Sequence, residues 1–202
     1  MTTLTKTFEI DLPAVSVRDA IYSRRATREY LTKPVSEKQI CALIDSAIRA
    51  PSAMNLQPWA FSVVQRPSLL KRISDAAKHK LLTSPEWLHH KDRGHIPLED
   101  SGFDIFYGAR TLIVICAKDD PGFSPAGDCY LAGQNLMLAA HEMGLATCPI
   151  GLARDVLFEQ VWKTELSIPK GYDVVLPIIV GYAATASPET QRAPANILSW
   201  VR

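Results

Sequence analysis

Two runs of apolar, β-branched residues constrain the fold of this chain more than any other feature. "TLIVICA" (Thr111–Ala117) and "DVVLPIIVGYA" (Asp173–Ala183) are nearly uninterrupted apolar segments of strand length. A strand without polar alternation is expected where both faces of a sheet are covered by other elements. The chain therefore predicts a central sheet with helices packed against both of its faces.

Helical patterns surround these two runs. Ser36 and Gln39 form a capping-box pattern, and the apolar residues that follow recur at helical spacing until Pro51 limits the helix. Gly144 marks the expected end of a long helix. The expected helices are Ser16–Arg25, the segment from Ser36 towards Pro51, Ser68–Leu82, Asp128–Met143 and Ala153–Leu166. The further expected strands are Trp59–Gln65 and a short one within Leu145–Gly151.

The segment Thr83–Gly108 has no steady periodicity and is predicted to be a long loop or a short helical excursion. Loops of this length often lie over sites. No repeat, low-complexity segment or linker divides the chain, so we expect a single domain over residues 1–202.

The charge balance argues against a surface built for nucleic acid. The chain has 22 Lys and Arg against 21 Asp and Glu, a net charge of +1, so any anion site must be local. No apolar run approaches the roughly 20 residues of a membrane span, and the first residues lack the pattern of a secretory signal. The four cysteines form no C-x-x-C pair and are interpreted as buried thiols of a cytoplasmic protein: Cys41, Cys116, Cys129 and Cys148.

Several possible sites lose support on inspection. The histidines of "HHKDRGH" (His89, His90, His95) have no cysteine or well-spaced carboxylate to complete a zinc site, so a solvated loop explains them better. Cys129 and His141 are twelve positions apart on one expected helix, roughly 18 Å, and do not touch within a monomer. The motifs of serine hydrolases, P-loop ATPases and Rossmann enzymes are absent from the sequence.

An arginine-rich segment offers a possible anion site. In "RRATREY" (Arg24–Tyr30), Arg24 and Arg28 would share a face if the preceding helix continued, and two guanidinium groups would then converge on one phosphate. A solvated helix end near the C-terminal dipole explains the same arginines.

The loop "APSAMNLQPWAF" (Ala50–Phe61) has two interpretations as well. Its two prolines and its amides fit a rigid wall of a site. They also fit a helix-to-strand connection in which Ser52 and Asn55 make local turn hydrogen bonds.

Taken together, these segments resemble the nitroreductase family of flavin-dependent NAD(P)H oxidoreductases. "SRRATREYLTKPVSEKQICALIDSAIRAPSAMNLQPWAFSVV" is similar to the N-terminal signature of that family almost without a gap. "GLATCPIG", "PIIVGYA" and "TQRAP" resemble its turn beneath the flavin, its last core strand and its C-terminal basic segment. The resemblance covers nearly the whole chain, least of all Thr83–Gly127. It implies an α+β fold: a three-layer α/β/α sandwich with a central, mostly antiparallel sheet, in an intertwined homodimer.

The resemblance also implies non-covalent FMN at the dimer interface. Arg24 and Arg192 match the positions that bind the phosphate, which carries about −1.5 to −2 charge. Arg28 matches a basic position at the ribityl chain or pyrimidine edge, where positive charge favours the reduced flavin. Arg25 and Ala26 belong to the same matched segment.

Two further segments would contact the isoalloxazine ring. Four positions match a loop that usually reaches the ring from the partner subunit: Pro51, Ser52, Ala53 and Asn55. Three positions match the turn that packs on the ring: Pro149, Ile150 and Gly151. In that turn, the backbone N–H of Gly151 is expected to donate to flavin N5.

The chain departs from the family pattern in three places. Ala26 replaces a common serine, and Gly151 replaces an acidic residue that some members carry. Residues 66–110 contain no asparagine, which some members use against the flavin pyrimidine. Candidates to replace it are Lys78, His79 and Lys80.

The implied reaction is a ping-pong turnover in which NAD(P)H reduces the flavin and a nitroaromatic or quinone then accepts the electrons at the same place. The cofactor carries the chemistry, so no side-chain acid or base is required. A specialised flavoprotein of the same fold (a dehalogenase, an enone or azoline oxidoreductase, or a flavin-destroying enzyme) and a non-catalytic flavin sensor are the alternatives. Four aromatic residues fit either a lid for planar substrates or ordinary core packing: Trp87, Phe103, Phe106 and Phe123.

Overall fold

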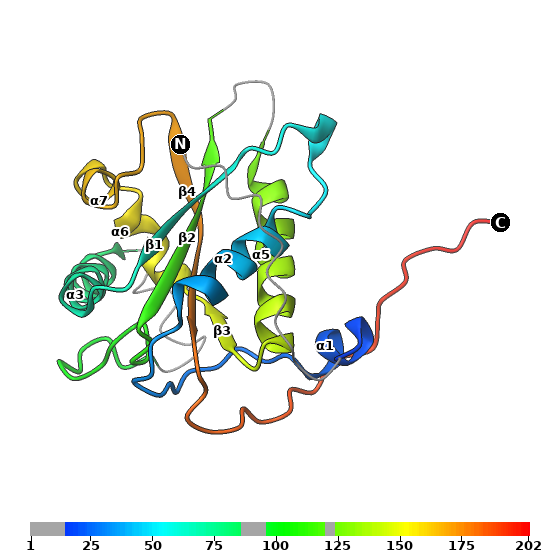
Figure 1. Ribbon diagram of the computed structural model, residues 1–202, viewed down its shortest axis with the longest axis horizontal. Helices are drawn as coiled ribbons and strands as arrows, with labels where there is room; N and C mark the ends of the chain where they lie inside the picture. Colours follow the sequence, from blue (N-terminus) through cyan, green and yellow to red (C-terminus); the bar gives the residue numbers. More distant parts are fainter. Residues whose placement is uncertain (1–14, 86–95, 120–123) are drawn as a thin grey trace.

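The computed structural model describes residues 15–85, 96–119 and 124–202 (Figure 1). The three histidines of the "HHKDRGH" segment, together with Trp87 and Phe123, lie outside the described residues.

The sheet contains both of the apolar runs at its centre. Its four strands are β1 (Trp59–Val64), β2 (Thr111–Lys118), β3 (Ala146–Pro149) and β4 (Tyr172–Gly181). Their order is β1-β2-β4-β3, and every neighbouring pair is antiparallel. Strand β2 is buried from Thr111 to Ala117, and β4 from Val174 to Gly181. The prediction of strands covered on both faces is therefore confirmed.

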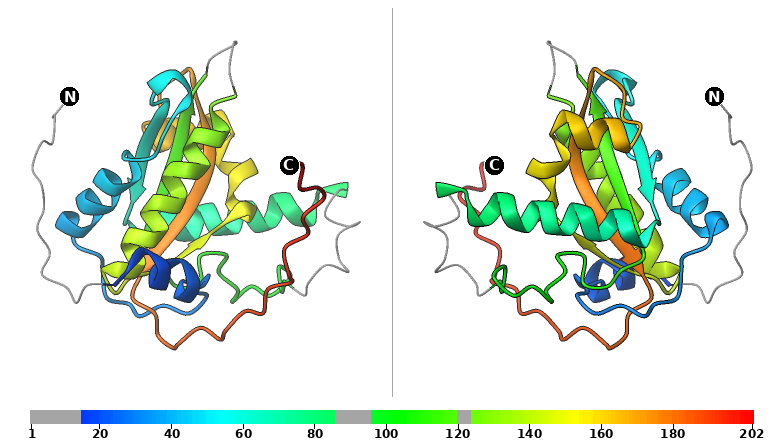
Figure 2. Two further views of the ribbon diagram at one scale, coloured as in Figure 1. Left: turned by 90° about the vertical axis from the view of Figure 1, so that its right-hand side faces the viewer. Right: turned by 90° about the vertical axis from the view of Figure 1, so that its left-hand side faces the viewer.

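Helices cover the sheet on both sides, which gives three layers (Figures 1 and 2). One face carries α3 (Pro67–Leu82), α6 (Arg154–Leu157) and α7 (Gln160–Glu165). The other face carries α2 (Glu37–Ala47) and α5 (Ala126–Glu142). Helix α1 (Val17–Ser23) packs against α5. The α+β, three-layer prediction is confirmed.

Local signals in the sequence define the ends of the main helices. Ser36 and Gln39 make both hydrogen bonds of a capping box at the start of α2. After α5, Gly144 has a φ of 68°, and the N–H of Leu145 donates to the carbonyl of Ala140 at 2.8 Å. This left-handed turn is the C-terminal stop expected of glycine, and it aims the chain into β3.

Two predicted helices end earlier than their sequence pattern suggests. The helix expected over 16–25 ends at Ser23, because Arg24 adopts extended geometry (φ −57°, ψ 133°) and the chain then pairs with β3. The helix expected over 153–166 is divided into α6 and α7 by Glu159, which is also extended (φ −67°, ψ 141°). In both places backbone geometry that the pattern does not encode ends the helix.

No helix among the described residues has the length and apolar character needed to cross a bilayer.

All four cysteines are free thiols, as the sequence predicts, but they differ in exposure. Cys116, Cys129 and Cys148 are buried, whereas Cys41 on α2 is only partly buried. Burial raises the pKa of Cys116 and of Cys129 to about 12, and it also raises the pKa of Cys148. Buried thiols of this kind are poor nucleophiles.

We expect at most one thiol to react with a disulfide reagent such as DTNB in the native protein at pH 8. A thiol of pKa about 12 is ionised in only about one molecule in ten thousand at that pH. In denaturant all four thiols should react, and Cys41→Ser should remove the fast native phase. Rapid reaction of a second thiol in the Cys41→Ser variant would contradict the burial of the other three.

Candidate functional site

The arginine-rich segment runs as an extended chain along the edge of the sheet. The N–H of Thr27 donates to the carbonyl of Thr147 in β3 at 3.1 Å, and Ala26 bridges Thr147 in parallel. Side chains of an extended segment alternate between two sides. Arg24 and Arg28 therefore lie on one side, as the sequence suggested, but through strand alternation rather than a shared helix face.

The side that holds Ala26 faces the core beneath α3. Ala26 and Tyr30 both pack against the buried cluster that α3, α6 and α7 share with the sheet. Thr27, which is only 5% exposed, turns the other way. The segment thus separates two environments at one edge of the sheet.

A cluster of arginines gathers at the start of this segment. Burial lowers the pKa of Arg24, and the neighbouring charges of Arg192 and Arg25 lower it further. Arg192 follows Arg24 by more than 160 residues, so the fold brings these two predicted phosphate ligands together. Within the described part of the chain, no ion pair forms to any arginine of this cluster.

Arg28 lies further along the same side, close to Tyr107 and Cys148. Burial raises the pKa of Tyr107, while the adjacent guanidinium of Arg28 acts in the opposite direction. The same charge lowers the pKa of Cys148, although burial has the larger effect and leaves that pKa raised. The sequence analysis did not identify Tyr107. The only feature of the sequence that marks this residue is the glycine that follows it. In the structure, Tyr107 and Gly108 both have positive φ (53° and 76°).

The turn after β3 ends next to this group. The N–H of Ile150 donates to the carbonyl of Pro177 at 2.9 Å, and Ile150 itself is 4% exposed. Gly151 begins the 3-10 helix η3 (Gly151–Ala153), where an N–H has no acceptor within the helix. No atom lies within 4 Å of the position that a Cβ on Gly151 would occupy. A ligand can therefore approach its backbone N–H closely.

The loop of residues 51–57 lies elsewhere. It is at the opposite end of the molecule from α1 in all three views (Figures 1 and 2). The hydroxyl of Ser52 accepts from the N–H of Gln57 at 3.0 Å, and the N–H of Ala53 donates to Asp128 at 3.2 Å. Met54 and Asn55, with φ of 50° and 56°, hold a left-handed turn. Pro51, Ser52, Ala53 and Asn55 are not brought to the arginine cluster of their own chain.

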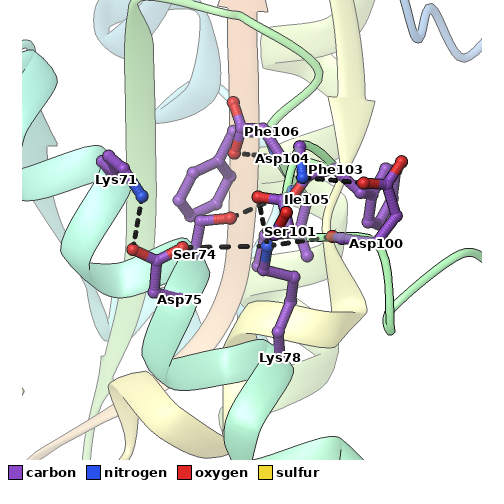
Figure 3. A network of polar contacts seen from close by, with 11 residues as sticks. Lys71, Ser74, Asp75, Lys78, Asp100, Ser101, Phe103, Asp104, Ile105 and Phe106 are labelled. Carbon is purple, nitrogen blue, oxygen red and sulfur yellow. Dashed lines mark hydrogen bonds and ion pairs between the residues drawn. The ribbon is translucent and has the colours of Figure 1, made fainter.

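Of the three basic residues of α3 that were candidate flavin ligands, Lys78 and Lys80 are engaged in other contacts, whereas His79 is exposed. Figure 3 shows the ammonium group of Lys78 pointing at the segment that follows residue 96. It donates to the carbonyls of Phe103 (2.7 Å), Asp100 (3.4 Å) and Ser101 (3.5 Å). Lys80 donates to the carbonyl of Asp155. Neither ammonium group is free to act as a ligand.

Lys78 belongs to a polar network that attaches this segment to α3 (Figure 3). The hydroxyl of Ser74 accepts from the N–H of Ile105 at 3.1 Å, and Asp104 accepts from the N–H of Phe106 at 3.0 Å. Phe106 is 0% exposed, so it is a core residue and not part of a substrate lid. The network holds the turn that carries Tyr107.

Comparison with known proteins identifies the family. The model of the nitroreductase family matches residues 21–182, which include the arginine-rich segment, the 51–57 loop and the turn after β3. This chain belongs to the nitroreductase family.

Relatives and solved structures agree with that assignment. The chain is 30% identical over 208 residues to the 4-nitrobenzoate reductase of Pseudomonas putida, covering 88% of this chain and 90% of the relative. It is 30% identical over 142 residues to a putative NADH dehydrogenase/NAD(P)H nitroreductase of Methanothermobacter thermautotrophicus, a match over 68% of this chain and 62% of that relative. A nitroreductase with bound FMN from Bacteroides fragilis has the same fold, with a TM-score of 0.79, 24% identity, and coverage of 94% and 100% of the two chains.

We expect Lys78→Met to loosen residues 100–109 while the rest of the fold stays intact. The substitution removes three hydrogen bonds to backbone carbonyls but keeps the apolar stem of the side chain. Amide hydrogen exchange at 100–109 should speed up by about tenfold. The matched control is Lys71→Met on the same helix, whose ammonium group makes an exposed ion pair with Asp75 (Figure 3). Equal effects of the two variants would remove the special role of Lys78.

Proposed function

We propose that this protein binds FMN non-covalently and uses NAD(P)H to reduce nitroaromatic, quinone or related planar acceptors. The observation that carries the proposal is the cluster of the half-buried Arg24 and the exposed Arg192, in which neither arginine has a carboxylate partner among the described residues. It lies at the same sheet edge as Arg28 and the exposed turn at Gly151. Burial and neighbouring positive charges both disfavour the protonated form of Arg24, and an anionic ligand would compensate both effects.

The residues present fit the chemical groups of FMN. Arg24 and Arg192 would bind the phosphate, for which paired guanidinium groups are suited. Ala26, between Arg24 and Arg28, offers space and no hydroxyl, so it would contact the cofactor only by packing. Arg25 is the least suited of the matched residues, because its Nη1 donates to the carbonyls of Tyr22 (2.6 Å) and Arg24 (3.0 Å).

The ring end of the site would use backbone groups as much as side chains. Arg28 would place positive charge near the pyrimidine edge, and Tyr107 beside it would border the same edge. Pro149 and Ile150 would support the ring, and the N–H of Gly151 would donate to N5. Because Gly151 adds no carboxylate, the positive charge of Arg28 would be uncompensated until the reduced, anionic ring is present.

The site would be completed by a second copy of the chain in an intertwined homodimer. Residues Pro51, Ser52, Ala53 and Asn55 lie too far from their own arginine cluster and would edge the ring of the partner. Exposed apolar side chains support a covered surface on α1, where Val17 is 73% and Tyr22 is 69% exposed. The extended C-terminal tail, with Trp200 72% exposed, supports the same interpretation (Figure 1).

The chemistry that FMN would supply, when bound, is to take a hydride from NAD(P)H and to deliver it to the second substrate. The chain would bind and orient the reactants in turn at one exposed ring face, which makes the turnover ping-pong. No acid or base among the side chains is needed for this role. We further propose that residues 1–202 form one domain and that the protein is cytoplasmic, which its free, buried thiols support.

We expect the purified protein to be yellow, with an absorption band at about 450 nm that bleaches when NADH or NADPH is added without oxygen. Addition of a nitroaromatic or a quinone should then restore the band. A flavin that stays oxidised with both nicotinamides would overturn the reductase proposal in favour of a non-catalytic flavoprotein. Reoxidation by one acceptor class alone would indicate a specialised enzyme of the same fold.

Replacing both proposed phosphate ligands should release the cofactor. In Arg24→Ala/Arg192→Ala we expect the FMN content after purification to fall at least about tenfold, because each charged hydrogen bond contributes about 1.5–3 kcal/mol. The matched control is Arg66→Ala/Arg202→Ala, which removes two exposed arginines elsewhere. Stoichiometric FMN in the first variant would show that the phosphate binds in another place.

A further inference from the structure

Helix α1 is tied to the last turn of α5 by one polar contact. The Nε2 of His141 lies 2.7 Å from the hydroxyl oxygen of Ser23, the last residue of α1. Within the described ranges of the chain, no other hydrogen bond or ion pair joins these two helices. The contact therefore lies directly before Arg24, where the extended segment begins.

The direction of this hydrogen bond follows from the other contact of Ser23. Its hydroxyl oxygen lies 2.5 Å from the carbonyl oxygen of Asp19, and two oxygens this close need a proton between them. The single hydroxyl proton of Ser23 is thus used towards Asp19. His141 is left as the donor, through an Nε2–H that points at the oxygen of Ser23.

The charge of His141 agrees with this role. Burial lowers its pKa, and the charges of Arg24 and Arg25 lower it further, so the imidazole is neutral at pH 7. A neutral imidazole carries one N–H, and the contact with Ser23 places it on Nε2. His141 therefore anchors α1 without adding a third positive charge beside two arginines.

Helix α1 has few other contacts that could fix the place where it stops. It is seven residues long, and Ala20 is its one buried residue. Helices shorter than about 12 residues are marginal on their own. The N–H of Arg24 still donates to the carbonyl of Ala20 at 3.0 Å, but Arg24 itself is already extended. The hydrogen bond from His141 acts at this junction.

The stretch that begins with Arg24 is held at both ends. At one end His141 donates to Ser23, and at the other the N–H of Thr27 donates to the carbonyl of Thr147 at 3.1 Å. His141 and Thr147 belong to one continuous piece of the chain, which consists of the end of α5, the turn after it and β3. The two anchors together fix the backbone between them.

We infer that His141 is a positioning residue for the cofactor phosphate: through Ser23 it fixes the backbone from which Arg24 approaches that phosphate. This role rests on the proposed function, in which Arg24 binds the phosphate of FMN. Because His141 acts through Ser23 and not on the flavin ring, its effect should be confined to the phosphate end of the site. A contribution to folding alone would affect every flavin equally.

The test compares the affinities of FMN and of riboflavin, which is FMN without its phosphate. Both are measured by the quenching of flavin fluorescence on the full-length chain, after the bound flavin has been removed by dialysis. His141→Ala should weaken FMN binding about three- to tenfold, the range of one lost hydrogen bond, and should change riboflavin binding by less than about twofold.

Two conservative variants separate the donor from the side chain as a whole. His141→Gln places an amide N–H where Nε2 lies, and it should restore FMN affinity to within about twofold of the parent. His141→Asn places its amide at the position of Nδ1, too short to reach Ser23, and should bind FMN as weakly as His141→Ala.

The acceptor provides an independent check. Ser23→Ala should weaken FMN binding to a similar extent, and Ser23→Ala/His141→Ala should bind no more weakly than either single variant, because both changes remove the same contact. The matched control is Gln134→Ala, at an exposed residue seven positions before His141 on α5, which should bind FMN like the parent.

Equal weakening of FMN and riboflavin in His141→Ala would overturn the positioning role, since it would show a general loss of structure. Unchanged FMN affinity in that variant, or additive losses in the double variant, would overturn it as well. These results would leave the proposed function intact, because the parent chain would still bind FMN. A parent chain that binds neither flavin would overturn the proposed function itself, and the role of His141 with it.

Discussion

The hydrogen bond between the N–H of Thr27 and the carbonyl of Thr147 is the contact on which the functional edge of this molecule depends. It attaches the arginine-rich segment to β3 and fixes the register of the segment, so that Arg24, Ala26 and Arg28 face one side. A shift by one residue would exchange the two sides, since side chains alternate along an extended chain. Tyr30 supports the same register further along the segment. Its ring packs so closely on Gly181 that a Cβ at position 181 would lie 2.8 Å from it.

That register concentrates positive charge at one edge of a protein whose net charge is only +1. Arg24 is partly buried and has Arg25 and Arg192 as neighbours, and all three effects lower its pKa. The protonated form is therefore less stable here than in water, and an anion at this edge relieves both desolvation and repulsion. The charged cluster is better explained as preparation for a ligand than as a contribution to folding.

Much of this arrangement could be predicted from local patterns in the sequence. The strands β2 and β4, the capping box at Ser36 and the glycine stop at Gly144 are encoded within a few residues and were predicted with nearly correct bounds. The extended course after Ser23 was not predicted, because it results from pairing with β3 more than 100 residues away. Helical periodicity has no information about such a contact, and tertiary pairing overrode local propensity.

The candidate site shows the same division between local and distant information. The family signature predicted Arg24, Arg28 and the 149–151 turn, but it gave no reason to consider Tyr107. Tyr107 lies near Arg28 because Lys78 and Ser74 attach residues 100–105 to α3. Residues without periodicity become part of a site through contacts that anchor their backbone. Lys78 illustrates this point, since a lysine that the sequence offered as a ligand serves instead to bind three backbone carbonyls.

The two sides of the segment are chemically unequal, and the difference follows from what packs behind each one. On the α3 side, Ala26 and Tyr30 rest on an apolar cluster, which favours a flat ring with a charged end. On the α5 side, Thr147, Thr27 and His141 line a cleft with hydroxyl and imidazole groups. Arg24 borders both environments, so a negative charge on either side changes the potential that the other side experiences.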